Sequence, residues 1–271
     1  MPVKAERLSM TYPGSTVPAL DSVSLEVHDG EIAVLFGANG SGKSTLLRCL
    51  SGLAKPTEGT ITIDGTPAEQ ARRRVSLAIQ FPERALFEPT IYDDIAFGPR
   101  NHRRGTTEQE AIDLLVREAA DAAGLPLETL SMHHRSLSYG QRRLAAIASV
   151  IATKPGYLFL DEPAAGLDTG ALRRITRLVR RLKAGGTTIV IASHDPLAFM
   201  DGCDRLIVLK AGQVAVDRPP LDADLVEAGI VSDTLAVARA LQRRGWDVPE
   251  TFSPETLADS IAETIHHEDS G

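Results

Sequence analysis

The chain has 271 residues, enough for one large domain with an appendage, and its 43% hydrophobic and 24% charged residues are typical of a globular protein. The net charge of −7 is uneven, because residues 217–271 hold 12 acidic and 4 basic residues, and no strongly basic face remains to indicate a nucleic-acid partner. No apolar run reaches the roughly 18 residues of a membrane-spanning helix, and the first ten residues lack the apolar segment of a signal peptide.

The first third of the chain predicts several strands and one helix. Alternating or wholly apolar strand patterns occupy residues 8–12, 23–27, 31–36, part of 59–68, and 75–80. A glycine-rich turn follows residues 31–36, and the next segment predicts a helix over residues 44–53.

The remainder alternates helices with buried strands. Helical spacing covers residues 106–124, 138–153 and 171–184, and buried strands are expected at residues 157–160, 187–191 and 206–209. This alternation predicts an α/β fold with a largely parallel sheet, interrupted by a helical subdomain over about residues 85–153. "DRPPLDADL" marks a boundary near residue 216, and weaker helices are expected at residues 234–244 and 254–264.

"GANGSGKST" carries the strongest chemical signal, because it fits G-x-x-x-x-G-K-[ST] between a buried strand and a helix. The backbone of such a loop wraps a phosphate chain, and the helix N-terminus adds positive charge. We expect Lys43 to reach the β- and γ-phosphates and Ser44 to hold Mg²⁺. The nucleotide-binding residues predicted here are Gly37, Ala38, Asn39, Gly40, Ser41, Gly42, Lys43, Ser44 and Thr45.

"YLFLDEPAAGLD" places two carboxylates at the end of a buried strand. Asp161 there can bind Mg²⁺ through water, and Glu162 can orient or deprotonate an attacking water molecule. Without the phosphate loop, the same pattern would describe a strand end with solvated acids.

With these motifs in place, residues 1–216 resemble the ATP-binding cassette of ABC ATPases. The resemblance implies a P-loop cassette with an antiparallel β subdomain, a mostly parallel core sheet and a helical subdomain, using ATP and Mg²⁺. "LSYGQ" is similar to the family's LSGGQ signature, which closes over the nucleotide of a second cassette, although Tyr139 replaces a glycine. The signature residues are Ser138, Tyr139, Gly140 and Gln141. Local geometry alone would also allow Ser138 to lie beside its own site or simply to cap a helix.

The resemblance assigns four further residues. Asp168 matches the D-loop at the contact between cassettes, and His194 in "IASHD" matches the switch histidine that touches the γ-phosphate. Tyr12 lies where the family stacks an aromatic ring on adenine, although an ordinary edge-strand tyrosine would occupy the same place. Gln80 matches the glutamine of the Q-loop, which ligates Mg²⁺ and joins the core to the helical subdomain.

The segment after Gln80, "QFPERALFEPT", contains two phenylalanines close to a strand end. In the family, residues here contact the membrane subunit, which implies that Phe81, Pro82, Glu83 and Phe87 line a groove for a partner's helix. Packing of Phe81 and Phe87 under the helical subdomain is the alternative, and the sequence leaves both open.

The longer segment "QFPERALFEPTIYDDIAFGPRN" and the tail "RALQRRGWDVPETFSPETLADSI" are similar to ATPase subunits of energy-coupling factor (ECF) importers, of the cobalt/nickel type. This resemblance implies two ATPases, a transmembrane coupling subunit and a substrate-capturing membrane subunit that import a vitamin or metal ion. Residues 217–271 would form a helical extension that joins the ATPases at the cytoplasmic face of the membrane, although its acidic residues could serve solubility alone.

The leading hypothesis is therefore an ATP-driven transport motor. A conventional ABC importer or exporter, a soluble ABC ATPase acting on DNA or ribosomes, and a kinase-like phosphate-loop enzyme are the competing hypotheses. The chain lacks the long insertions, zinc cysteines or basic tract of the soluble class, and the expected partners include no nucleic acid. Its only cysteines, Cys49 and Cys203, match no metal spacing and are expected as thiols of a reducing compartment.

Overall fold

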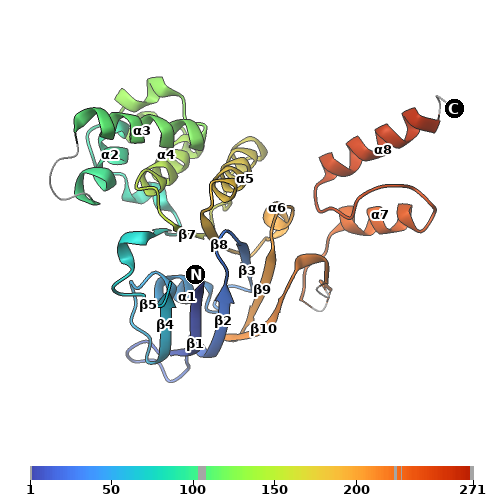
Figure 1. Cartoon of the computed structure of the whole chain (residues 1–271), viewed down its shortest axis with the longest axis horizontal. Helices are drawn as coiled ribbons and strands as arrows, with labels where there is room; N and C mark the ends of the chain where they lie inside the picture. Colours follow the sequence, from blue (N-terminus) through green and yellow to red (C-terminus); the bar gives the residue numbers. More distant parts are fainter. Residues whose placement is uncertain (1, 103–107, 223–224, 227, 269–271) are drawn as a thin grey trace.

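The computed structural model describes residues 2–102, 108–222, 225–226 and 228–268, whose strands form two sheets (Figure 1). The smaller sheet is antiparallel with the order β2-β1-β4-β5. Its strands are β1 (Val3–Met10), β2 (Leu20–Val27), β4 (Glu58–Ile63) and β5 (Thr66–Pro67). Buried and accessible residues alternate along β2, as expected of a sheet that covers a core with one face.

The larger sheet has six strands in the order β10-β9-β3-β8-β7-β6, and all neighbours are parallel except β10 and β9. Its strands are β3 (Ile32–Phe36), β6 (Val75–Ala78), β7 (Tyr157–Asp161), β8 (Thr188–Ser193), β9 (Arg205–Lys210) and β10 (Gln213–Arg218). The parallel strands coincide with the buried segments expected from the sequence. Strand β10 was not expected, and the boundary placed near residue 216 falls within it.

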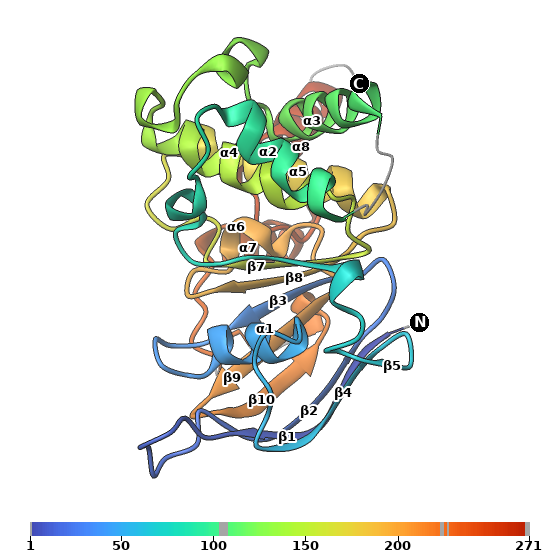
Figure 2. The same cartoon turned by 90° about the vertical axis from the view of Figure 1, so that its left-hand side faces the viewer.

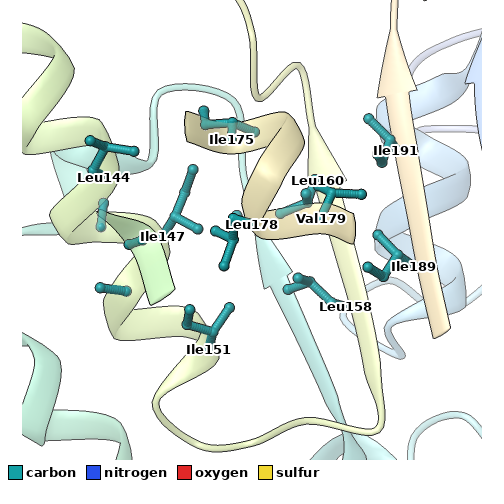
Figure 3. Close-up of a cluster of buried hydrophobic side chains, with 14 of the residues drawn as sticks. Leu144, Ile147, Ile151, Leu158, Leu160, Ile175, Leu178, Val179, Ile189 and Ile191 are labelled. Carbon is teal, nitrogen blue, oxygen red and sulfur yellow. The ribbon is translucent and has the colours of Figure 1, made fainter. Parts of the chain in front are cut away.

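Side chains of the parallel strands alternate between two hydrophobic clusters. Val34 and Leu160 belong to the first cluster, whereas their neighbours Leu35 and Phe159 belong to the second. The first cluster includes side chains of α4 (Tyr139–Ile151) and α5 (Thr169–Ala184), which meet β7 and β8 in Figure 3. The second includes α1 (Lys43–Leu50) and the antiparallel sheet. Figure 2 shows α1 on one side of the parallel sheet and α2 to α5 on the other.

Helices α2 (Ile91–His102), α3 (Gln109–Ala123) and α4 pack against one another in the region where a helical subdomain was expected. Helix α3 ends at Gly124, whose φ of 69° suits a residue without Cβ. Residues 106 and 107 of the expected helix lie outside the described residues. Short 3₁₀ helices cover Arg72–Arg74, Pro82–Ala85, Leu127–Ser131, His134–Ser136 and Pro220–Asp222.

The C-terminal helices α7 (Asp233–Gln242) and α8 (Pro254–Glu268) lie beyond the short helix α6 (Leu197–Met200), away from α2 to α4 (Figure 1). Asp201, which follows α6, links the segment before α8 to the rest of the chain. Its carboxylate accepts hydrogen bonds from the Thr251 hydroxyl at 3.0 Å and the Phe252 amide at 2.9 Å. Within the described residues, no helix combines the length and apolar character needed to cross a membrane. Residues 223, 224, 227 and 269–271 of the expected extension lie outside this description.

Candidate functional site

The loop between β3 and α1 is shaped by its glycines. Gly42 has a φ of 106°, and a Cβ added there would lie 2.5 Å from the carbonyl oxygen of Ala19. A Cβ added to Gly37 would lie 2.4 Å from the carbonyl oxygen of Leu209. Both positions therefore require glycine, which is the property that the phosphate-loop pattern predicts. Helix α1 begins directly after this turn and directs its positive N-terminal end toward the loop.

Lys43, the first residue of α1, bridges the loop and the carboxylates beyond it. Its ammonium donates to the carbonyl oxygens of Gly37 at 2.7 Å and Ala38 at 3.2 Å. Its Nζ also lies 3.8 Å from Glu162 Oε1, in a contact where both side chains are nearly inaccessible to solvent. Burial lowers the pKa of Lys43, and the charges of Glu162 and Asp161 oppose that shift.

Asp161 ends β7 with a carboxylate that suits a divalent cation. The side chain is only 5% exposed, and its Oδ1 has no hydrogen-bond partner among the described residues. Burial raises the pKa of Asp161, the hydrogen bond with Ser44 opposes this rise, and the Glu162 charge adds to it. A carboxylate oxygen without a partner beside a hydroxyl is the donor set that Mg²⁺ prefers, so Ser44 and Asp161 fit this ion.

Glu162 and His194 meet at the same edge of the sheet. Glu162 Oε2 lies 2.7 Å from His194 Nδ1, which donates this bond when the carboxylate is ionised. The backbone of Glu162 has a φ of 52°, in the left-handed region, and its amide donates to the carbonyl of Ala192 at 2.9 Å. The structure thus brings together the two residues predicted to be catalytic, with the carboxylate held between a lysine and a histidine.

Tyr12 and Gln80 differ in how closely they approach this centre. The Tyr12 hydroxyl lies 3.1 Å from Thr45 Oγ1, so the ring stands at the rim of the phosphate loop with 38% of its surface exposed. Gln80 follows β6 at the same sheet edge and is exposed. None of the hydrogen bonds between described residues joins Gln80 to Ser44 or Asp161.

The signature residues and Asp168 begin two neighbouring helices. Ser138 Oγ accepts from the Gln141 amide at 3.2 Å, and Gln141 Oε1 accepts from the Ser138 amide at 2.9 Å, forming a capping box for α4. Asp168 caps α5 by accepting from the Ala171 amide at 2.7 Å. A Cβ on Gly140 would lie 3.6 Å from Ala171, so the two helix starts are in contact.

The two phenylalanines after Gln80 occupy different environments. Phe81 is half-buried with a φ of 60°, and the Arg84 guanidinium lies 4.8 Å from its ring centroid. Phe87 is 63% exposed and makes an edge contact with Phe97 at 5.1 Å between centroids. A groove of about 190 Å³ lies there, lined by Pro82, Phe87 and Phe97 together with Leu77, Ala78, Ile79, Ala85, Leu86, Asp94, Gly98, Ala146, Ser149 and Val150. Phe87 thus lines this groove, whereas Phe81 is not among the residues that line it.

Sequence reasoning missed Arg143, the largest of the fully buried side chains. It hydrogen-bonds the carbonyl oxygens of Glu162 and Pro163 and therefore belongs to the surroundings of the site. Helical spacing could have identified it, because Arg143 shares the α4 stripe of Ile147 and Ile151, which the structure buries.

Comparisons with known proteins agree with this geometry. The sequence profile of the family described as ABC transporter matches residues 20–165. The energy-coupling factor transporter ATP-binding protein EcfA2 of Symbiobacterium thermophilum is 38% identical over 92% of this chain and 91% of its own length. The structure of cbiO1 from Clostridium perfringens, described as part of the ABC transporter complex cbiONQ, has a TM-score of 0.76 and 31% identity over 90% of this chain and 96% of its own.

A second solved structure, the dimeric post-hydrolysis state of the ATP-binding cassette MJ0796 bound to ADP and Pi, has a TM-score of 0.73 and 28% identity. It covers 80% of this chain and 98% of its own. These neighbours confirm the expected fold of a P-loop cassette with one antiparallel and one mostly parallel sheet. The phosphate loop, the paired carboxylates and the extent of these similarities together show that the chain belongs to the ABC transporter family, as an ATPase.

Proposed function

We propose that this chain is the ATP-hydrolysing subunit of an ECF-type complex that imports a micronutrient, either a B vitamin or a cobalt or nickel ion. The observation that carries the hydrolytic part is the convergence of Lys43, Asp161, Glu162 and His194 beside a glycine-shaped loop. Similarity to EcfA2 proteins over nearly the whole chain supports the ECF assignment.

In this proposal the loop amides and Lys43 bind the triphosphate of ATP. Lys43 exchanges the Gly37 and Ala38 carbonyls for phosphate oxygens, which carry more negative charge. Mg²⁺, held by Ser44 and Asp161 with Gln80 as a further ligand, would neutralise charge on the phosphates. Glu162 accepts the proton of the attacking water, and His194 orients the Glu162 carboxylate and contacts the γ-phosphate.

The proposal also requires a second ATPase subunit, either a copy of this chain or a paralogue. Ser138, Tyr139, Gly140 and Gln141 would contact the nucleotide held by that subunit, and Asp168 would lie at the contact. The exposure of Ser138 at a helix N-terminus supports this role, because such a terminus binds anions. The helices after β10, within residues 217–271, would add to the contact between the ATPases.

Phe87 would dock the transmembrane coupling subunit, and a further membrane subunit would capture the solute. The exposed edge-to-face pair of Phe87 and Phe97 over an apolar groove supports docking of a partner's helix. The same segment contains Pro82, which is buried, and Glu83. Together with Phe81, these residues would couple the docking segment to the nucleotide site. The chain would then work at the cytoplasmic face of the membrane through its protein partners.

Affinity purification of the tagged chain from solubilised membranes of its own host tests this assignment. We expect an ATPase whose activity falls with Glu162→Gln, together with a small coupling protein and a solute-capturing subunit identified by mass spectrometry. Recovery of a conventional permease pair would refute the ECF assignment but not the ATPase. Recovery of ribosomes or DNA would refute the transport function.

A further inference from the structure

Arg143 satisfies all its guanidinium nitrogens inside the protein, with none of its surface exposed. Its Nε donates to the carbonyl of Pro163 at 3.2 Å, and Nη2 donates to the carbonyl of Glu162 at 2.5 Å. Its Nη1 donates to the Tyr139 hydroxyl at 3.1 Å and to Glu83 Oε2 at 3.4 Å. One cation thus joins four groups on three segments.

The two carbonyl contacts act on the backbone that carries the Glu162 carboxylate. Glu162 lies just beyond β7, and its carbonyl oxygen accepts a hydrogen bond from the Ala165 amide at 3.2 Å in addition to the one from Arg143. Its positive φ is unfavourable for a residue with a Cβ and persists only where neighbours hold it. The Arg143 fork holds two successive carbonyls, which fixes the peptide orientation from which the side chain reaches Lys43 and His194.

The remaining guanidinium nitrogen of Arg143 contacts two side chains from other segments, Glu83 and Tyr139. Glu83 lies in the 3₁₀ helix that follows Gln80, and its side chain is 8% exposed, so it supplies a buried counter-charge. Tyr139 is the first residue of α4, next to Ser138. Its ring also packs beside Gly166, where an added Cβ would lie 3.8 Å from the ring and the hydroxyl.

We propose that Arg143 is a positioning residue for Glu162, and that Glu83 and Tyr139 orient its guanidinium. A movement of the segment after Gln80, or of the N-terminal end of α4, then changes the geometry of Glu162 within the same chain. This inference rests on the proposed function, in which Glu162 is the base for ATP hydrolysis. Tyr139, which replaces a glycine of the signature pattern, acquires a role within its own subunit.

The geometry requires an arginine rather than any cation. The planar fork aims its N–H groups at acceptors on opposite sides, whereas lysine offers a single nitrogen at the end of a flexible chain. A misplacement of about 1 Å at a reacting group can cost about 100-fold in rate. We therefore expect Arg143→Lys to lower kcat by about 10- to 100-fold while the ATP dissociation constant changes by less than about threefold.

The experiment measures kcat, KM and ATP affinity of the full-length chain for Arg143→Lys, Glu83→Gln and Tyr139→Phe. Arg142→Lys is the matched control, because Arg142 is the neighbouring arginine on the partly exposed side of α4. We expect Glu83→Gln and Tyr139→Phe to lower kcat less than Arg143→Lys does, and their effects to be non-additive with it. Because these two changes are nearly isosteric, they test the inference even if Arg143→Lys does not fold.

Equal loss of kcat and ATP affinity, or wild-type kcat in all three variants, would show that Arg143 serves only the packing of α4. Additive effects of Glu83→Gln and Arg143→Lys would also overturn the linkage. Glu162→Gln, measured in parallel, distinguishes a failure of the proposed base from a failure of the proposed positioning role. Wild-type turnover in Glu162→Gln would refute the proposed base itself, whereas an inactive Glu162→Gln with a fully active Arg143→Lys would refute the positioning role alone.

Discussion

Replacing Glu162 with glutamine should separate ATP binding from hydrolysis. Glutamine keeps the shape of the side chain but removes the charge that lies 3.8 Å from Lys43 Nζ. The attraction between two unit charges at this distance is about 4 kcal/mol at an effective dielectric constant of about 20. Both side chains are at most 8% exposed, so dissolved salt screens this attraction only weakly.

ATP must compete with Glu162 for Lys43, so removing the carboxylate should tighten ATP binding. If ATP binding to the wild-type protein disrupts about one third of this attraction, Glu162→Gln should gain about 1.4 kcal/mol of ATP-binding free energy. This gain corresponds to an about tenfold lower dissociation constant. Removal of a general base should at the same time lower kcat by about 100- to 10,000-fold.

Calorimetric titration with ATP and a steady-state phosphate-release assay would measure the two effects. Glu118→Gln is the control, because Glu118 on α3 forms a surface ion pair with Lys154, and its replacement should leave both quantities unchanged. Weaker ATP binding by Glu162→Gln would show that Glu162 does not compete with ATP for Lys43. Undiminished turnover would show that Glu162 is not the base.

Four further substitutions test separate parts of the molecule. Lys43→Ala should weaken ATP binding by about 100-fold, because it removes a charged donor to the phosphates, and titration calorimetry would detect an unchanged affinity as a contradiction. Phe87→Ser should alter the free energy of unfolding by at most about 0.5 kcal/mol yet reduce recovery of the coupling subunit, whereas Phe81→Ser should cost about 2 kcal/mol in urea unfolding. Burial raises the pKa of Asp161 above its unfolded value, so the ionised group destabilises the fold increasingly as pH rises through the interval between the two values. Asp161→Asn should therefore raise Tm at pH 7 in metal-free buffer while abolishing Mg²⁺-dependent ATPase activity, and a lower Tm would contradict this sign.

The strands and the residues at their ends could be predicted from the sequence, because their patterns are local. Strands β3 and β7 are short apolar runs, and the glycines and carboxylates that follow them have few alternative explanations in combination. Their assembly at one edge then follows from parallel pairing, which places the ends of neighbouring strands together.

Features that depend on contacts between distant segments could not be predicted in this way. Helix α2 passes through Gly98 and Pro99, which resemble a helix end in the sequence. A Cβ on Gly98 would lie 2.8 Å from Thr153, so glycine is needed for the close approach of α2 to the end of α4. Arg143 likewise finds its acceptors about 20 and 60 residues away, at separations that helical periodicity does not report.

The alternation of side chains between the two hydrophobic clusters also protects the alignment of the site. If β8 slipped by one residue against β3 or β7, its side chains would exchange clusters, and every buried contact on both faces would change at once. Such a slip would also displace His194 from Glu162, because the β7–β8 pairing aligns Asp161 with Ala192. The burial of these side chains therefore stabilises the same strand register that aligns the reacting groups. A sheet with a shifted register would be too unstable to fold, so it would not accumulate as a defective enzyme.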